Sequence, residues 1–128
     1  MVVCGSPKPE TGVQFPPPLP RYMEFKEIQS NVIKNAKDYG KEFDVEIDED
    51  YALLKLYEEA GELAQAVLIH RKKSRPSKHL PKEESKVKVA EELADVIGFT
   101  IVVADLLGID LEDIVTKKWL NRKEYHSK

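Results

Sequence analysis

The chain has 128 residues, of which 34% are charged, and its formal net charge at pH 7 is −3. This length suits one domain, and this charge balance predicts solubility without pointing to nucleic acid or a membrane as a partner. The single cysteine, Cys4, excludes an intramolecular disulfide and has no zinc-type companions, so a reducing cytoplasm is the simplest compartment.

The first twenty residues differ in composition from the rest of the chain. They hold six of the eight prolines and lack the basic start and apolar run of a signal peptide. We expect residues 1–20 to form a flexible or polyproline-like arm, whose role the sequence leaves open. Residues 21–128 are expected to form one domain.

Two helices are predicted in the first half of this domain. Apolar residues at helical spacing indicate a helix over 22–38, which Gly40 is expected to stop. The acidic segment 42–50 is predicted to be a loop, in which Asp48 or Asp50 could cap the next helix. That second helix is expected over residues 51–73, where one apolar stripe recurs.

Two further helices are predicted after a polar and basic loop. The third is expected over 82–107, with Gly108 at its end, and the fourth over 111–125, capped by Asp110. The apolar run near the end of the third helix is shorter than the ~20 residues of a membrane span, so it reads as a core segment. No strand pattern is visible, which predicts an all-α bundle of about four helices.

Paired acids mark the two long central helices. Glu59 and Glu62 stand three residues apart in the second helix, and Glu92 and Asp95 are spaced likewise in the third. Residues at this spacing share a helix face, where like charges repel each other. The four carboxylates are therefore candidates for a site that needs concentrated negative charge.

The helix faces that carry these acids continue into apolar residues. Phe99 and Val102 follow on the line of Glu92 and Asp95, and Ile69 follows on the line of the acids in the second helix. We therefore expect the acids to face apolar neighbours. Burial of an unpaired carboxylate costs several kcal/mol, so this setting calls for a cation.

The chemistry of the donors indicates which cation. Oxygen ligands without His or Cys select a hard ion, which favours Mg²⁺ with Mn²⁺ as a substitute. Mg²⁺ keeps much of its water and usually binds through a few carboxylates together with substrate phosphates. The sequence therefore predicts a polyphosphate ligand.

Other interpretations of the acids stay open. On ordinary charged helices, they would pair with Lys55, Lys86 or Lys88. A ferritin-like oxidase would need Glu-x-x-His pairs, which are absent. Glu58 and Glu91 precede motif acids, but they point about 100° away from them and are expected to lie outside the site.

Basic residues gather in two places. Residues 70–79 join the acidic helices and fit either a solvated loop or a cover over an anionic ligand. In the last predicted helix, Lys117 and Asn121 stand four residues apart and share a face, where they and Arg122 could supply donors to phosphate.

The sequence resembles the all-α nucleoside triphosphate pyrophosphohydrolases of the MazG-like superfamily. The resemblance covers about residues 22–125 and rests on Glu59-x-x-Glu62 and on the run 91–96, Glu-Glu-Leu-Ala-Asp-Val. The tail 117–125, with Asn121-Arg122, looks like the dCTP pyrophosphatase branch. Ile69 stands where those enzymes carry a tryptophan, so the resemblance leaves the preferred base open.

The resemblance implies cleavage of a (d)NTP between its α and β phosphates, to give a (d)NMP and pyrophosphate. It implies that Glu59, Glu62, Glu92 and Asp95 are metal ligands and that Phe99 matches an aromatic substrate contact. Members of this family are homodimers or homotetramers, and the apolar third helix agrees with an oligomer.

The function expected from the sequence is therefore Mg²⁺-dependent pyrophosphohydrolysis in nucleotide-pool house-cleaning. Which carboxylate activates the water is left open. The alternative is a non-enzymatic helical interaction domain with a vestigial metal site.

Overall fold

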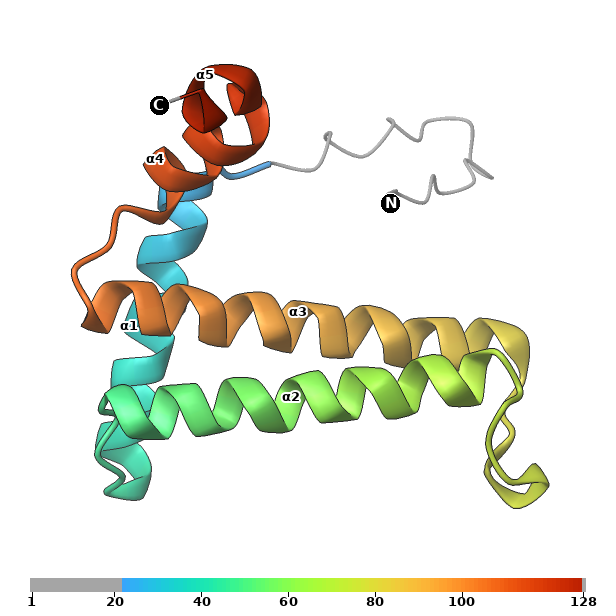
Figure 1. Cartoon of the computed structure of the whole chain (residues 1–128). Coiled ribbons are helices and arrows are strands. Elements are labelled where there is room, and N and C mark those ends of the chain that lie inside the picture. The colour runs from blue at the N-terminus through green and yellow to red at the C-terminus, as the bar shows by residue number, and fades with distance from the viewer. Residues whose placement is uncertain (1–21, 128) are drawn as a thin grey trace, which may run out of the picture.

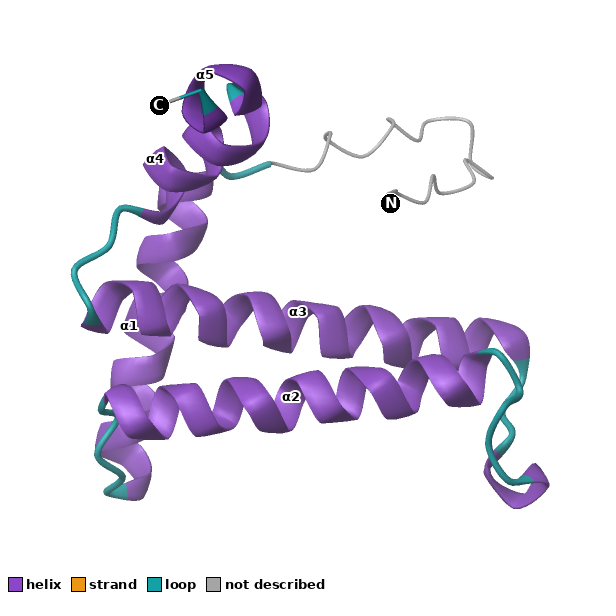
Figure 2. Cartoon of the chain, viewed as in Figure 1, coloured by secondary structure: helices purple, strands orange, loops and turns teal. Residues whose placement is uncertain are grey.

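The computed structural model describes residues 22–127, in which every regular element is helical (Figures 1 and 2). In chain order the elements are α1 (Phe25–Phe43), α2 (Glu49–His70), the 3₁₀ turn η1 (Pro76–Lys78), α3 (Lys82–Leu106), α4 (Leu111–Val115), the π-helical turn η2 (Thr116–Leu120) and α5 (Arg122–His126). The all-α prediction is confirmed. The expected arm, 1–20, lies outside the described residues.

The two long helices α2 and α3 form an antiparallel hairpin, and α1 crosses the end where α2 begins and α3 ends (Figure 1). The buried apolar residues of the described part are few: Ala52, Ala66, Ile101, Val102 and Ala104. At the far end of the hairpin, Ser85 is almost fully buried and its hydroxyl lies 2.8 Å from Nδ1 of His70. This contact joins the end of α2 to the start of α3.

The first helix does not stop at Gly40, as the sequence had suggested, but continues to Phe43. Its end is marked by Asp44, which adopts the left-handed conformation with φ 54°. A Cβ atom at Gly40 would lie 2.8 Å from the carbonyl oxygen of Val45. The lack of a side chain at Gly40 therefore lets the backbone after the helix pass close to it. Gly40 does not end the helix.

The cap predictions for two later helices are confirmed. Asp48 accepts a hydrogen bond from the backbone N–H of Tyr51 at 2.8 Å, and Asp110 accepts one from Asp113 at 3.0 Å. Gly108, with φ 68°, follows the end of α3 in the left-handed conformation that glycine adopts without strain. The starts of α2 and α4 and the end of α3 therefore lie where the capping and turn residues predict them.

The single fourth helix expected over 111–125 is wrong, because three short segments replace it. The backbone N–H of Asn121 bonds to the carbonyl of Thr116, five residues back, and Asn121 then leaves the helical conformation. None of these segments contains a fully buried residue. Among residues 22–127, no helix has the length and apolar character needed to cross a membrane.

Candidate functional site

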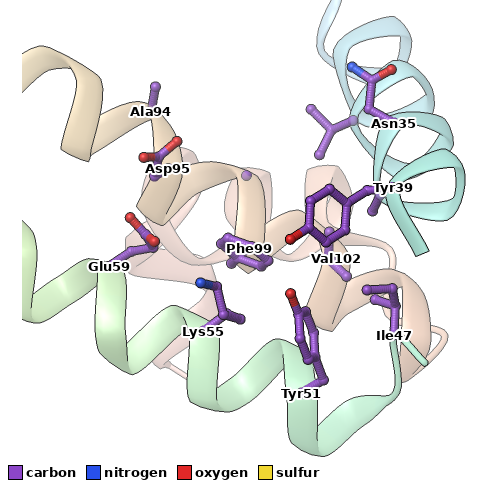
Figure 3. Close-up of a pocket in the computed structure, with 13 residues that line it drawn as sticks. Asn35, Tyr39, Ile47, Tyr51, Lys55, Glu59, Ala94, Asp95, Phe99 and Val102 are labelled. Atoms are coloured by element: carbon purple, nitrogen blue, oxygen red, sulfur yellow. The ribbon is translucent and has the colours of Figure 1, made fainter. Parts of the chain in front are cut away.

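The four acids of the two motifs meet near the middle of the hairpin. Carboxylate oxygens of Glu59, Glu92 and Asp95 all lie within 4.8 Å of one another. Those of Glu59, Glu62 and Glu58 form a second group with the same spacing, so the expectation that Glu58 points away from the cluster is wrong. Glu59 belongs to both groups and is the centre of the cluster, and Figure 3 shows its carboxylate facing that of Asp95 across the hairpin.

The burial of these acids is uneven. Glu59 is only 7% exposed and Glu92 is half-buried, as the apolar continuation of the helix faces predicted. Glu62 and Asp95 are exposed, so the same prediction is wrong for them. The reason is geometric, because only two helices flank the cluster within the described chain and its outer side opens to solvent.

The electrostatics of the cluster are those of an uncompensated negative site. Burial raises the pKa of Glu59 to about 7, and the charges of Glu62, Asp95 and Glu92 add to this effect. One carboxylate oxygen of Glu92, Oε2, is buried without a hydrogen-bond partner. Buried carboxylate oxygens normally find a donor or a cation.

The lysines near the cluster bind other acids. Lys55 pairs with Glu58, and Lys88 lies 3.8 Å from Glu91. None of the four motif acids forms an ion pair within residues 22–127. The expected alternative partners Lys55 and Lys88 therefore neutralise the neighbours of the motif acids and not the motif acids themselves.

The donor set fits a hard divalent cation. It consists of carboxylate oxygens alone, with a partnerless oxygen among them, and no histidine belongs to either acidic group in the described chain. His70, the closest histidine in sequence to the first motif, is bonded to Ser85. These observations argue against a di-iron site of the ferritin type.

A cavity of about 480 Å³ adjoins the cluster on the side of α1 (Figure 3). Glu59 and Asp95 form one end of it. Phe99 also lines the cavity, as expected from its place on the same helix face as Asp95. The whole lining is Val32, Asn35, Ala36, Tyr39, Ile47, Tyr51, Lys55, Glu59, Ala94, Asp95, Gly98, Phe99 and Val102. The cavity therefore joins an acidic end to an aromatic end.

Sequence reasoning missed the contributions of α1 and of the first turns of α2. Tyr51, Lys55 and Glu59 follow one another at four-residue spacing, which places them on one face of α2. That spacing was a usable signal. Asn35 and Tyr39 gave none, because only the crossing of α1 over the hairpin brings them to the cavity.

A second hollow, of about 310 Å³, lies on the other side of the cluster. Glu62 and Glu92 line it together with Lys88, Gln65, Ala66, Ile69 and Leu80. The motif acids therefore stand between two hollows. One is lined by aromatic rings, and the other reaches toward the loop between α2 and α3.

The predicted phosphate donors of the C-terminal segment lie elsewhere. Lys117, Asn121 and Arg122 are exposed, and they line neither hollow. Lys117 pairs with Asp113 at 2.9 Å. In Figure 1 this segment stands beside the start of α1, where Lys26 forms ion pairs with residues at the start of α4. The described chain does not bring these residues to the carboxylates.

Comparison with known proteins assigns the chain to a family. The model of the MazG-like family matches residues 58–128, more than half of the chain, and this chain belongs to that family. It is 44% identical over 62 residues to the uncharacterized protein YvdC of Bacillus subtilis (strain 168). That match covers 47% of this chain and 58% of YvdC, so it spans little more than half of the relative.

Proposed function

We propose that this protein hydrolyses a (d)NTP at the α–β phosphate bond, with Mg²⁺, and releases a (d)NMP and pyrophosphate. The proposed role is house-cleaning of the nucleotide pool. The observation that carries the proposal is the unpaired carboxylate cluster, with the partnerless oxygen of Glu92, between two hollows. Membership of the MazG-like family supports it. Assignment to the dCTP pyrophosphatase-like branch stays a prediction.

The larger hollow suits the nucleoside. Its volume of about 480 Å³ lies within the range of small-molecule sites, roughly 300–1,000 Å³. Phe99, Tyr51 and Tyr39 supply aromatic surface for a base, and the amide of Asn35 supplies a donor and an acceptor. With the base there, the phosphates extend to the acids at the other end.

The carboxylates Glu59, Glu62, Glu92 and Asp95 would hold the cation. A bound divalent cation supplies charge neutralisation for the phosphoryl oxygens and makes water more acidic. In the reaction, the oxygen of water attacks the α-phosphorus, and the bond from this phosphorus to the bridging oxygen breaks. The pyrophosphate leaves with that electron pair, and a carboxylate of the cluster accepts the proton of the water.

A homodimer or homotetramer is part of the proposal. Large apolar side chains on the outer surfaces of the hairpin, Leu53, Leu54, Tyr57, Leu93 and Ile97, are between 47% and 71% exposed. The buried apolar core of the described chain is small by comparison, which favours burial against a second copy. Light scattering during size exclusion would test this, and Leu54→Lys is expected to shift the protein toward monomer.

The C-terminal donors acquire a role in such an oligomer. Lys117, Asn121 and Arg122 do not reach the carboxylates of their own protomer. We propose that they contact phosphate bound at the site of another copy. Arg122→Ala should then raise KM without lowering the affinity for Mg²⁺ alone.

The test of the activity is a panel of common NTPs and dNTPs with Mg²⁺, read by product identity. A (d)NMP and pyrophosphate are expected from at least one substrate, and Asp95→Asn should slow the reaction by about a hundredfold or more. Release of a nucleoside diphosphate and orthophosphate would refute the cleavage site. Mg²⁺ binding without turnover of any substrate would instead favour a vestigial metal site.

A further inference from the structure

A longer repeat than the paired acids relates the two central helices. In α2 the sequence from Lys55 to Glu62 reads Lys-x-x-Glu-Glu-x-x-Glu, and in α3 the sequence from Lys88 to Asp95 reads Lys-x-x-Glu-Glu-x-x-Asp. Each motif therefore begins with a lysine that stands four residues before the first candidate metal ligand of its helix. At that spacing the lysine and the ligand share a helix face.

The antiparallel course of the helices sends the two lysines to opposite sides of the cluster. Lys55 precedes its motif acids on α2 and lines the larger hollow. Lys88 precedes its motif acids on α3 and lines the smaller one. In the described chain these are the lysines that line a hollow bordered by the carboxylates, one on each side.

Each lysine lies near an acid that is not one of the four motif acids. Lys55 pairs with Glu58, and its Nζ lies 5.9 Å from the centre of the Phe99 ring. Figure 3 shows its ammonium between Phe99 and the carboxylate of Glu59. Lys88 lies 3.8 Å from Glu91. Both pairs are at three-residue spacing, so the helix itself holds each ammonium near the cluster.

We propose that the two lysines divide the polyphosphate between them, with Lys55 binding the α-phosphate and Lys88 binding the leaving pyrophosphate. This inference rests on the function proposed above. Lys55 stands where the aromatic end of the larger hollow meets the acids, the place of the phosphate that is attached to the nucleoside. Lys88 stands beyond the acids, on the side that the departing phosphates would occupy.

The division of roles gives Glu58 a function as a positioning residue, because its carboxylate pairs with Lys55 while the site is empty of phosphate. Phosphate oxygens then compete for the ammonium. Glu91 is exposed and has no such role, since its oxygen lies 3.8 Å from Lys88. In this account Glu58 does not bind the cation, although one of its oxygens lies within the second acidic group. Glu58→Gln should therefore change phosphate affinity while leaving the affinity for Mg²⁺ alone unchanged.

The experiment is a crossed measurement of product binding in Mg²⁺, by calorimetry or as product inhibition. The ligands are pyrophosphate and the nucleoside monophosphate formed from the triphosphate that the wild type hydrolyses fastest. Lys55→Gln should weaken monophosphate binding by about tenfold and leave pyrophosphate binding within about twofold. Lys88→Gln should do the reverse. It should also lower kcat, because charge develops on the leaving pyrophosphate.

The controls separate charge from structure. Lys55→Arg and Lys88→Arg keep the charge and should retain most of the binding that the Gln variants lose. Lys86→Gln removes an exposed lysine of α3 that lines neither hollow, and it should bind both products like the wild type.

Two results would overturn the inference, and they differ in what they say of the activity. In the first, the wild type hydrolyses a triphosphate, but each Gln variant weakens the binding of both products equally or of neither product. The division between the lysines is then wrong, and the proposed function stands. If the wild type binds neither product and hydrolyses no triphosphate, the proposed function falls and takes the inference with it.

Discussion

Protonation of Glu59 should couple the stability of the metal-free protein to pH. Burial and the neighbouring acids raise the pKa of this carboxyl from 4.5 to about 7 in the folded protein. Because the folded pKa lies above the unfolded one, the stability contribution is fully present below pH 4.5 and is lost as the pH rises to about 7. With about 1.4 kcal/mol for each pKa unit, the whole loss is about 3 kcal/mol.

Most of this loss falls between about pH 5 and about pH 8, where it amounts to about 2–3 kcal/mol. The assay is urea unfolding with EDTA at the two pH values, for the wild type and Glu59→Gln. The side chain of the variant is neutral at both pH values. Between about pH 5 and about pH 8, the free energy of unfolding of the variant should therefore rise relative to that of the wild type by about 2–3 kcal/mol. Glu91→Gln, which changes an exposed acid, should keep the pH profile of the wild type.

Parallel pH profiles for the wild type and Glu59→Gln would refute the reasoning. They would mean that Glu59 is solvated in solution, or that other groups offset its charge. Mg²⁺ provides an independent check on the same group. Its affinity should rise over the same pH range, because the proton must leave the carboxylate before the cation binds.

Three further outcomes are expected from other residues. Mg²⁺ should raise the free energy of unfolding by RT ln(1 + [Mg²⁺]/Kd), which a higher Tm would report, and Glu62→Gln should reduce that gain. A wild-type Tm that does not change with Mg²⁺ would contradict the site. Glu92→Gln should lower kcat by about a hundredfold or more while Glu91→Gln keeps most activity, and equal loss in two folded variants would shift the site to the other helix face. Gly40→Ala should lower the free energy of unfolding by about 1–3 kcal/mol despite its better helix propensity, whereas Gly61→Ala, which meets open space, should not.

The chemistry of the site could be predicted from the sequence because it rests on local spacing. Acids three residues apart on each of two consecutive helices share a face, so packing of these two helices against each other can bring the acids together. That was enough to bring Glu59, Glu92 and Asp95 together. The caps at Asp48 and Asp110 were equally local, because each depends on a side chain and an N–H three residues later.

What the sequence could not predict depends on contacts between distant segments. Asn35 and Tyr39 reach the larger hollow only because α1 crosses the hairpin, and the end of α1 depends on the chain returning over Gly40. The periodicity of the last helix was visible, but no local pattern recorded the change of backbone conformation at Asn121 that breaks it. The sequence also could not predict the exposure of Asp95, because the apolar residues on a helix face do not show which other segment covers that face.

The most direct test of the central claim is hydrolysis in ¹⁸O-labelled water with Mg²⁺, with the products separated and weighed by mass spectrometry. Attack at the α-phosphorus places one labelled oxygen in the nucleoside monophosphate and none in the pyrophosphate, which is the result that this account predicts. Label in the pyrophosphate would place the attack on the β-phosphorus. Label in orthophosphate, with a nucleoside diphosphate as the other product, would place it on the γ-phosphorus. Label in orthophosphate would contradict α–β hydrolysis itself. Label in the pyrophosphate would leave the cleaved bond unchanged but would contradict attack at the α-phosphorus.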